Sequence, residues 1–338
     1  MLKGKLILVC CLLATISMFA QDADIIIVDD ELRPYCIPGC EGKSKAKGIL
    51  LQYDINPTYN LSSSSENPLF SGENNFVNTH SRLTFKAKAP FLNKESIKVI
   101  FGIKYSQENF VIEHTPSSVY NLHESLDRIS LKSFGTSLYI MKPFRGKTYL
   151  ITRLGVEFNG DYQKFVGFNP DYASYSVASI LGIKKNPNLD IGFGLGYRYK
   201  YGRHSVIPLI NYYHTFSPKW GIEATLPVKA ALRHNFSDNT ILLAKVSGHS
   251  GNYFLKEAST GSSFPAELAY SRTELQMGFE LQQKLYSLVW LGLAAGYRRD
   301  LNFSFNDPLV NPRSSVISSA ANDGLFFSIS LFVTPPKK

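Results

Sequence analysis

The chain has 338 residues, of which 44% are hydrophobic and 19% charged, and its formal net charge is +9. This composition fits a soluble globular domain and a β-barrel membrane protein equally well. After the N-terminus, no stretch approaches the roughly 18 consecutive apolar residues of a membrane-spanning helix, which excludes a helical membrane protein. The periodicity of the apolar residues must therefore separate the remaining classes.

Residues 1–20 have the organisation of a secretory signal peptide. Lys3 and Lys5 precede an apolar run at residues 6–19, and the small residue Ala20 follows the run. We expect cleavage after Ala20 and export of the mature chain. Removal of Lys3 and Lys5 lowers the formal net charge from +9 to +7.

Residues 21–47 form an N-terminal segment that contains Cys36 and Cys40, the two cysteines that remain after cleavage. Pro38 and Gly39 lie between them and favour a tight turn, and exported proteins mature where disulfides persist. We therefore expect a Cys36–Cys40 disulfide. A metal site is the alternative, but two thiolates without a nearby histidine fall short of four ligands, so no metal is expected.

Residues 189–202 show the clearest strand pattern in the chain. Apolar side chains and three tyrosines fall on one parity, whereas glycines, Asp190, Arg198 and Lys200 fall on the other. This period of two is that of a β-strand. A strand of a soluble sheet usually has about 5 to 6 residues, whereas a tilted strand that crosses a bilayer needs about 9 to 11, with aromatic residues at the interface. The segment therefore indicates a membrane β-barrel.

Similar alternation recurs along the chain. The clear segments are residues 48–61, 76–89, 97–105, 148–159, 220–234, 271–281, 289–305 and 325–333. Weaker candidates are residues 131–141, 172–183, 206–216 and 240–248. The alternation places Val77 on the outer, apolar face of its segment, and likewise Leu301, Phe303 and Phe305 on that of theirs.

The connections between these segments are of two kinds. Short turns at residues 142–147, 185–188 and 217–219 contain Pro, Gly or Asn, which reverse a chain tightly. Long connections at residues 62–75, 107–128, 249–267 and 306–323 are rich in Ser, Asn and Pro. Outer-membrane barrels have short periplasmic turns and longer extracellular loops in this way.

The segments number thirteen, whereas bacterial single-chain barrels have even strand numbers. Pro227 cannot donate to a sheet ladder, so it is expected to divide residues 220–234 into a tight hairpin and give fourteen strands. Twelve strands remain the alternative, if one weak segment is not a strand. The sequence thus predicts an all-β, transmembrane, antiparallel outer-membrane β-barrel at residues 48–338, in the cell outer membrane. Residues 21–47 would lie in the periplasm or fold into the barrel mouth as a small plug.

The mature chain resembles a domain-of-unknown-function family of outer-membrane β-barrel proteins from Bacteroidota (DUF6268). The resemblance rests on the Ala20-Gln21 signal exit, on the spacing of Pro208, Lys219-Trp220-Gly221 and Leu226-Pro227, and on the step from Asp238 to Leu242. It implies a fold and a location. It implies no activity and no catalytic residue.

Charge gives the indication of function. The inward-facing parity carries these basic residues: Arg82, Lys86, Lys88, Lys98, Lys104, Arg153, Arg198, Lys200, Lys229, Arg233, Arg272 and Arg298. The acidic residues on the same parity are Glu157, Asp190, Glu223, Glu274, Glu280 and Asp300. A net-basic lumen lowers the barrier for negative solutes, which predicts a porin-like passive pore or transporter for small polar or anionic solutes. Alternatively, in a narrow barrel these charges pair and fill the interior, which predicts a closed barrel that serves as a structural anchor or surface-binding protein.

An outer-membrane lipid-modifying enzyme is the third and least favoured class. The seven histidines are scattered, and His249-Ser250 is the nearest candidate pair. Adjacent residues of a strand face opposite ways, so this pair is not expected to form a catalytic dyad. We expect no enzyme and no cofactor. The expected partners are outer-membrane lipids, the barrel-assembly machinery and small anionic solutes, and no nucleic acid, because the basic residues form no continuous patch.

Overall fold

A computed structural model describes residues 40–66, 72–94, 96–113, 122–144, 147–256, 267–308 and 311–335. The predicted signal peptide and Cys36 lie outside these ranges. The strands are β1 (Ile49–Ser64), β2 (Glu73–Lys94), β3 (Ile97–Glu113), β4 (Ser130–Pro143), β5 (Thr148–Gly160), β6 (Ala173–Asn186), β7 (Leu189–Lys200), β8 (Arg203–Thr215), β9 (Trp220–Leu226), β10 (Lys229–Ser237), β11 (Thr240–Leu255), β12 (Leu268–Tyr286), β13 (Val289–Asp307), β14 (Asn311–Ala321) and β15 (Gly324–Val333). One α-helix, α2 (Leu122–Arg128), and a short 3-10 helix, η3 (Pro170–Tyr172), complete the described elements.

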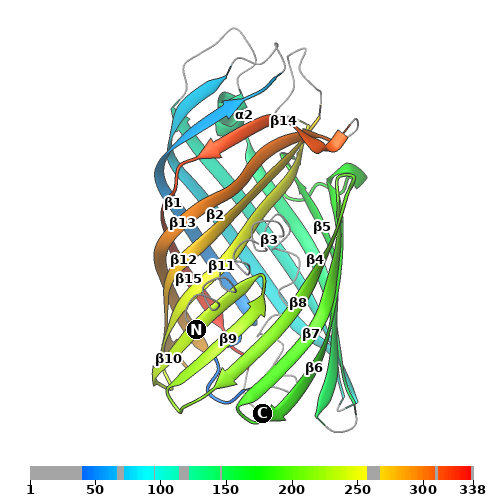
Figure 1. The fold of residues 1–338 in the computed structure, drawn as a ribbon, viewed down its shortest axis with the longest axis vertical. Helices are drawn as coiled ribbons and strands as arrows, with labels where there is room; N and C mark the ends of the chain where they lie inside the picture. Colours follow the sequence, from blue (N-terminus) through cyan, green and yellow to red (C-terminus); the bar gives the residue numbers. More distant parts are fainter. Residues whose placement is uncertain are drawn as a thin grey trace, which may run out of the picture.

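The strands form one antiparallel sheet that closes on itself as a barrel (Figure 1). Both β14 and β15 lie between β13 and β1, one after the other along the barrel axis: β15 pairs with the first half of β13 and β14 with its end. They therefore act as one interrupted strand, and the barrel has fourteen strands. The predicted fold class is confirmed. Pro227 lies between β9 and β10, where the predicted hairpin is found.

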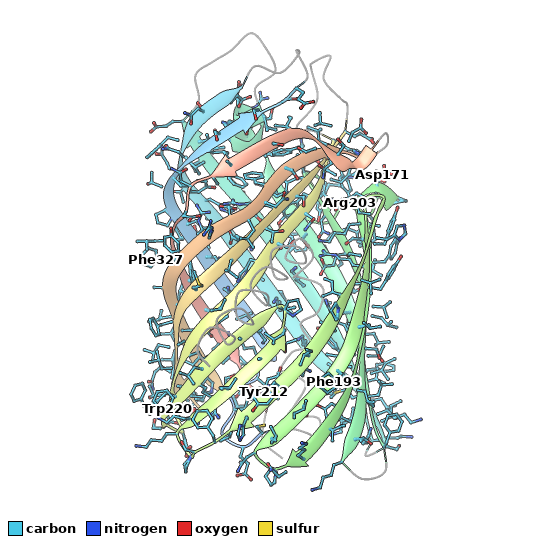
Figure 2. All side chains as sticks on the ribbon, in the orientation of Figure 1. Asp171, Phe193, Arg203, Tyr212, Trp220 and Phe327 are labelled. Atoms are coloured by element: carbon cyan, nitrogen blue, oxygen red, sulfur yellow. The ribbon has the colours of Figure 1, made fainter. Side chains whose placement is uncertain are left out.

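The outer face of the barrel is apolar. Phe193 on β7, Leu195 beside it and Phe279 on β12 are 59%, 61% and 62% exposed. Figure 2 shows Phe193 and Phe327 pointing away from the barrel, with Trp220 near its lower end. Aromatic residues of this kind collect at membrane interfaces, and so much exposed apolar surface is favourable only against hydrocarbon. None of the described helices is long and apolar enough to cross a membrane.

Four predicted orientations are wrong. Val77, Tyr201, Phe303 and Phe305 were expected on the outer face, but all four side chains are buried inside the barrel. Tyr201 follows the end of β7 in the turn to β8, where its φ of 42° ends the alternation of the strand. A β-bulge follows Val77 where β2 pairs with β3, and another leaves Leu301 out of the register between β12 and β13. Because an extra residue reverses the parity of a strand, the residues beyond each bulge turn inward.

The long connections are shorter than predicted. β3 extends to Glu113, β11 extends to Leu255, and β14 lies within the predicted connection 306–323. The predicted connection 107–128 also contains α2. These upper ends of the strands extend beyond the membrane, where the outer face meets water. The apolar alternation that identifies a membrane-spanning strand is therefore lost there.

An apolar cap fills the upper end of the barrel, the end with the long connections. Leu122 and Leu126 of α2 are fully buried against Tyr59, Phe110 and other inward side chains of β1–β4 and β11–β14. The Glu73 carboxylate accepts hydrogen bonds from the first two amides of α2, at 2.7 and 2.9 Å, and so holds the helix in place. We call this cluster the upper cap.

Candidate functional site in the barrel lumen

A cavity of about 270 Å³ lies in the lumen below the upper cap. It is lined by ten basic residues, namely Lys45, Lys47, Arg82, Lys86, Lys88, Lys104, Arg153, Arg198, Lys229 and Lys245. Only four acidic residues line it, namely Asp54, Glu157, Glu223 and Glu280. The formal surplus of positive charge makes this cavity the candidate site.

Glu157 on β5 is the carboxylate of the cavity wall around which three cations gather. Lys104 Nζ lies 3.8 Å from its carboxylate, and the Nη2 atoms of Arg153 and Arg198 each lie 4.0 Å from it. One carboxylate is thus shared by three cations. The side chain of Arg198 is only 4% exposed, and its Nη1 has no hydrogen-bond partner among the described residues. A buried donor without a partner is costly, so an anion in the cavity would stabilise Arg198.

Between this cavity and the upper cap lies a layer of paired charges. Arg272 makes a bidentate pair with Asp300, at 2.7 and 2.9 Å, and Arg298 Nη1 lies 2.5 Å from the same carboxylate. Arg82 Nη2 lies 3.0 Å from Glu108, and Glu274 faces Arg272 at 3.8 Å. The layer therefore holds three cations and three carboxylates, and its formal charge is balanced.

His80 belongs to the same layer. Its Nδ1 lies 2.9 Å from Asn56 Nδ2 and 3.2 Å from Arg272 Nη1, both of which are donors, so Nδ1 is the acceptor. The other nitrogen, Nε2, then carries the proton and donates to Glu108 at 2.7 Å. Tyr253 donates to Glu108 as well, at 2.9 Å. This histidine is a neutral part of the buried network.

The predicted inward-facing basic residues thus separate into groups. Lys86, Lys88, Lys104, Arg153, Arg198 and Lys229 line the cavity, and Arg82 lies at its border with the paired layer, where it pairs with Glu108. Arg272 and Arg298 lie in the paired layer, and Arg233 pairs with Glu223 at 3.1 Å. Lys200 is buried near the upper end of β7, and Lys98 lies near the lower end of β3. Among the predicted acidic residues, Asp190 accepts a hydrogen bond from Tyr149 at 2.8 Å.

The lower mouth of the barrel is crossed by residues 40–47, which we call the strap. At its start, Cys40 Sγ lies 3.0 Å from the carbonyl oxygen of Tyr213 on β8. Just after its end, the Gly48 amide donates to Val333 of β15 at 2.8 Å. In a ring of fourteen strands β8 and β1 are opposite each other, so the strap spans the mouth. The predicted Cys36–Cys40 disulfide stays a prediction, because Cys36 lies outside the described residues.

Two carboxylates of the barrel wall hold the strap. The amide and hydroxyl of Ser44 donate to Glu223, at 2.8 and 2.5 Å, and Lys47 Nζ donates to Glu280 at 3.0 Å. Three alternate lysines also lie over aromatic rings: Lys43 over Tyr213, Lys45 over Trp290 and Lys47 over Phe332, at 3.7, 5.0 and 5.0 Å from the ring centroids. Sequence reasoning missed these contacts, although the alternation of lysine in residues 43–47 indicates an extended segment with one cationic face.

The His249-Ser250 pair lies in β11, and His249 Nε2 contacts Ser247 Oγ at 3.2 Å. Within the described part of the chain, no three His, Cys, Asp or Glu side chains come together as a metal site.

Comparison with known proteins identifies the family. The model of the family "Domain of unknown function (DUF6268)" matches residues 52–307, which is most of the chain. The chain, a fourteen-stranded barrel, therefore belongs to this family, whose description assigns no activity. Among curated proteins, none matches the chain.

Solved structures of outer-membrane proteins are similar in outline. A Pseudomonas aeruginosa FadL homologue has 8% identity and a TM-score of 0.40, with 85% of this chain and 90% of that chain covered. The Pseudomonas putida toluene transporter TodX has 8% identity and a TM-score of 0.38, with 84% and 89% covered. The translocator domain of the autotransporter NalP from Neisseria meningitidis has 11% identity and a TM-score of 0.29, with 88% and 91% covered. At these values, none of them indicates what this chain binds.

Proposed function

We propose that this protein is a transport barrel of the cell outer membrane that carries small anionic solutes through its lumen. The observation that supports this is the surplus of cations around the cavity, where nine Lys and Arg residues face four Asp and Glu residues once Arg82, which pairs with Glu108 of the layer above, is left out. In a water-poor site such a surplus lowers the free energy of an anion and raises that of a cation. The paired layer above contributes no such preference, because its charges balance.

Passage requires a conformational change. The upper cap closes one end of the lumen and the strap crosses the other. Both ends must therefore open for passage. The upper cap consists of packed leucine and aromatic side chains, whereas the strap is held by polar and cation–π contacts with the wall, among them those of Ser44 and Lys47. We assign the strap as the movable element of the lower mouth, so that weakening its contacts raises the fraction of open barrels whatever the opening of the upper cap. A closed barrel that anchors surface loops is the second candidate function, and the upper cap is the observation that favours it.

Anion preference distinguishes the two candidates. Proteoliposomes containing the mature protein are expected to take up labelled chloride faster than rubidium. Replacement of two cavity cations, in the Lys104→Gln, Arg153→Gln variant, is expected to lower this ratio about threefold, because each removed charge raises the barrier for an anion by some tenths of a kcal/mol. The matched control is Lys219→Gln, which removes a lysine from the exposed β8–β9 turn. Equal uptake of the two ions by the unmodified protein would contradict the proposal.

A further inference from the structure

The barrel wall is incomplete above the β9–β10 hairpin. β8 pairs with β9 only over residues 210–215, and β10 pairs with β11 only as far as Ser247. Over residues 203–209, β8 has a neighbour among the described strands only on the β7 side. In Figure 1 the hairpin ends part of the way up the barrel, between β8 and β11. We call the interval between β8 and β11 above this hairpin the side window.

The side window is bounded at both ends. Below, the Gly248 amide donates to Val228 at the hairpin tip, at 2.9 Å. Above, Phe254 of β11 pairs directly with Gly160 of β5, and Tyr172 and Tyr201 pack against the Phe254 ring. The five residues 249–253 of β11 lie between these limits, which corresponds to a length of about 17 Å along the strand at 3.4 Å per residue.

The lumen cavity reaches this window. All residues from Ser247 to Tyr253 of β11 line the cavity, and so do all residues from Val228 to Ala231 at the hairpin tip. Successive side chains of a strand point to opposite faces, so a cavity that lay only inside the barrel would contact every second residue. The cavity therefore borders the whole stretch of β11 that has no neighbour on the β8 side, and it borders the hairpin tip below that stretch.

The outer rim of the window is apolar. Val206 on β8 is 58% exposed, and Leu195 on the adjacent β7, which pairs with Pro208, is 61% exposed. Val246 on β11 is exposed just below the window on the other side. The apolar belt of the barrel therefore continues past the hairpin tip. A strand edge at membrane depth is tolerated only where it lines a cavity or meets polar groups, so the edge of β8 at residues 203–209 requires a polar environment inside the window.

The inner side of the window carries two cations beside the buried apolar side chains of Ile207 and Leu209. Arg198 pairs in register with Ser205, in the part of β8 that borders the window. Its guanidinium is buried, and its Nη1 has no hydrogen-bond partner within the described ranges. Lys229 lines the cavity at the hairpin tip. A ligand with a negative head and an apolar chain fits both sides of such an opening.

We propose that the side window admits the phosphate or carboxylate headgroup of an anionic amphiphile from the membrane, with the headgroup in the cavity near Arg198 and the chain in the bilayer. This rests on the proposed anion-binding cavity and names a substrate class and an entry path for it. A free anion would share the headgroup chemistry but would enter through a mouth of the barrel.

Photolabelling tests the path. The probe is an alkyl phosphate with a diazirine on the carbon next to the headgroup, added to the full mature protein in phosphatidylcholine vesicles. Labelling is expected to concentrate at least about threefold in peptides that contain residues 228–231 and 247–253, relative to belt peptides around Phe193 and Phe279, because the carbon next to a bound headgroup lies in the window. Even labelling around the belt would overturn the proposal, and so would equal labelling by the uncharged alkyl alcohol analogue.

Variants and competition separate the possible outcomes. Arg198→Gln is expected to lower window labelling about threefold, whereas Lys219→Gln leaves it unchanged. If Arg198→Gln fails to fold, Ser250→Trp, on the β11 edge of the window, narrows the window and is expected to lower labelling similarly. Competition by inorganic phosphate as strong as that by unlabelled alkyl phosphate would overturn entry from the membrane while leaving anion transport intact. Absence of both labelling and anion uptake would contradict the proposed function itself.

Discussion

Mature protein carrying Ser44→Ala and Lys47→Gln is expected to conduct ions across a planar bilayer with an open probability at least about tenfold above that of the unmodified protein. The variant removes the Ser44 hydroxyl bond to Glu223 and the Lys47 pair with Glu280. A hydrogen bond to a charged group contributes about 1.5 to 3 kcal/mol, and a factor of ten in an equilibrium corresponds to about 1.4 kcal/mol. The loss of either contact alone therefore accounts for a tenfold increase in open probability.

The strap can leave the mouth without unfolding the barrel. Its residues belong to no strand, and the wall beneath Ser44 and Lys47 is complete, since β9, β10, β11 and β12 pair continuously at this height. The fold is therefore expected to survive the substitutions, which unchanged heat-modifiable gel mobility would verify.

The matched control is Ser217→Ala with Lys219→Gln. These residues lie in the β8–β9 turn at the same end of the barrel, where the Ser217 hydroxyl accepts only from the Trp220 amide at 3.1 Å. The control removes the same chemical groups outside the lumen, so its conductance should match that of the unmodified protein. If the strap variant conducts no more than the control, the strap is not the movable element, and the closed-barrel function gains support.

The fold was largely predictable because the bilayer requires apolar side chains on the outer face of each strand, which appear in the sequence at every second residue. β7 illustrates this, since Phe193 and Leu195 face outward while Arg198 and Lys200 are buried, as the alternation predicts. The hairpin at Pro227 was predictable for a different reason, because proline has no amide hydrogen for a ladder. Both signals are local and do not depend on how distant strands meet.

The site was less predictable because it depends on contacts between distant segments. The bulges at Val77 and Leu301 carry no local sequence signal, yet they decide which aromatic residues fill the upper end. Alternation placed Arg198 and Arg298 on the same inner face. The structure shows that their surroundings differ: Arg298 shares Asp300 with Arg272, whereas Arg198 lies beside the cavity. The two predicted interiors, one filled by paired charges and one with a basic surplus, are both present at different heights.

The paired layer leads to the second large prediction, which concerns stability. Asp300→Ala is expected to lower the free energy of unfolding by about 3 to 5 kcal/mol, the usual cost of removing one partner of a buried ion pair. Asp300 accepts from Arg272 at 2.7 and 2.9 Å and lies 2.5 Å from Arg298, and both guanidiniums are essentially buried. Without Asp300, the nearest carboxylate is Glu274, at 3.8 and 4.0 Å from the two arginines, which is too far for direct hydrogen bonds.

Urea titration of the folded barrel, followed by its heat-modifiable gel mobility, measures this change. The matched control is Asp323→Ala, because the Asp323 carboxylate lies 3.9 Å from Arg299 in an exposed pair, which contributes about 0 to 1 kcal/mol.

The Asp300→Ala, Arg298→Met double variant should regain part of the loss, since it removes one of the two uncompensated charges together with the carboxylate. Equal midpoints for Asp300→Ala and Asp323→Ala would mean that water reaches the layer and screens its charges. The layer would then no longer separate the upper cap from the cavity, and a continuous aqueous path would run further up the lumen than the packing of Phe303 and Phe305 implies.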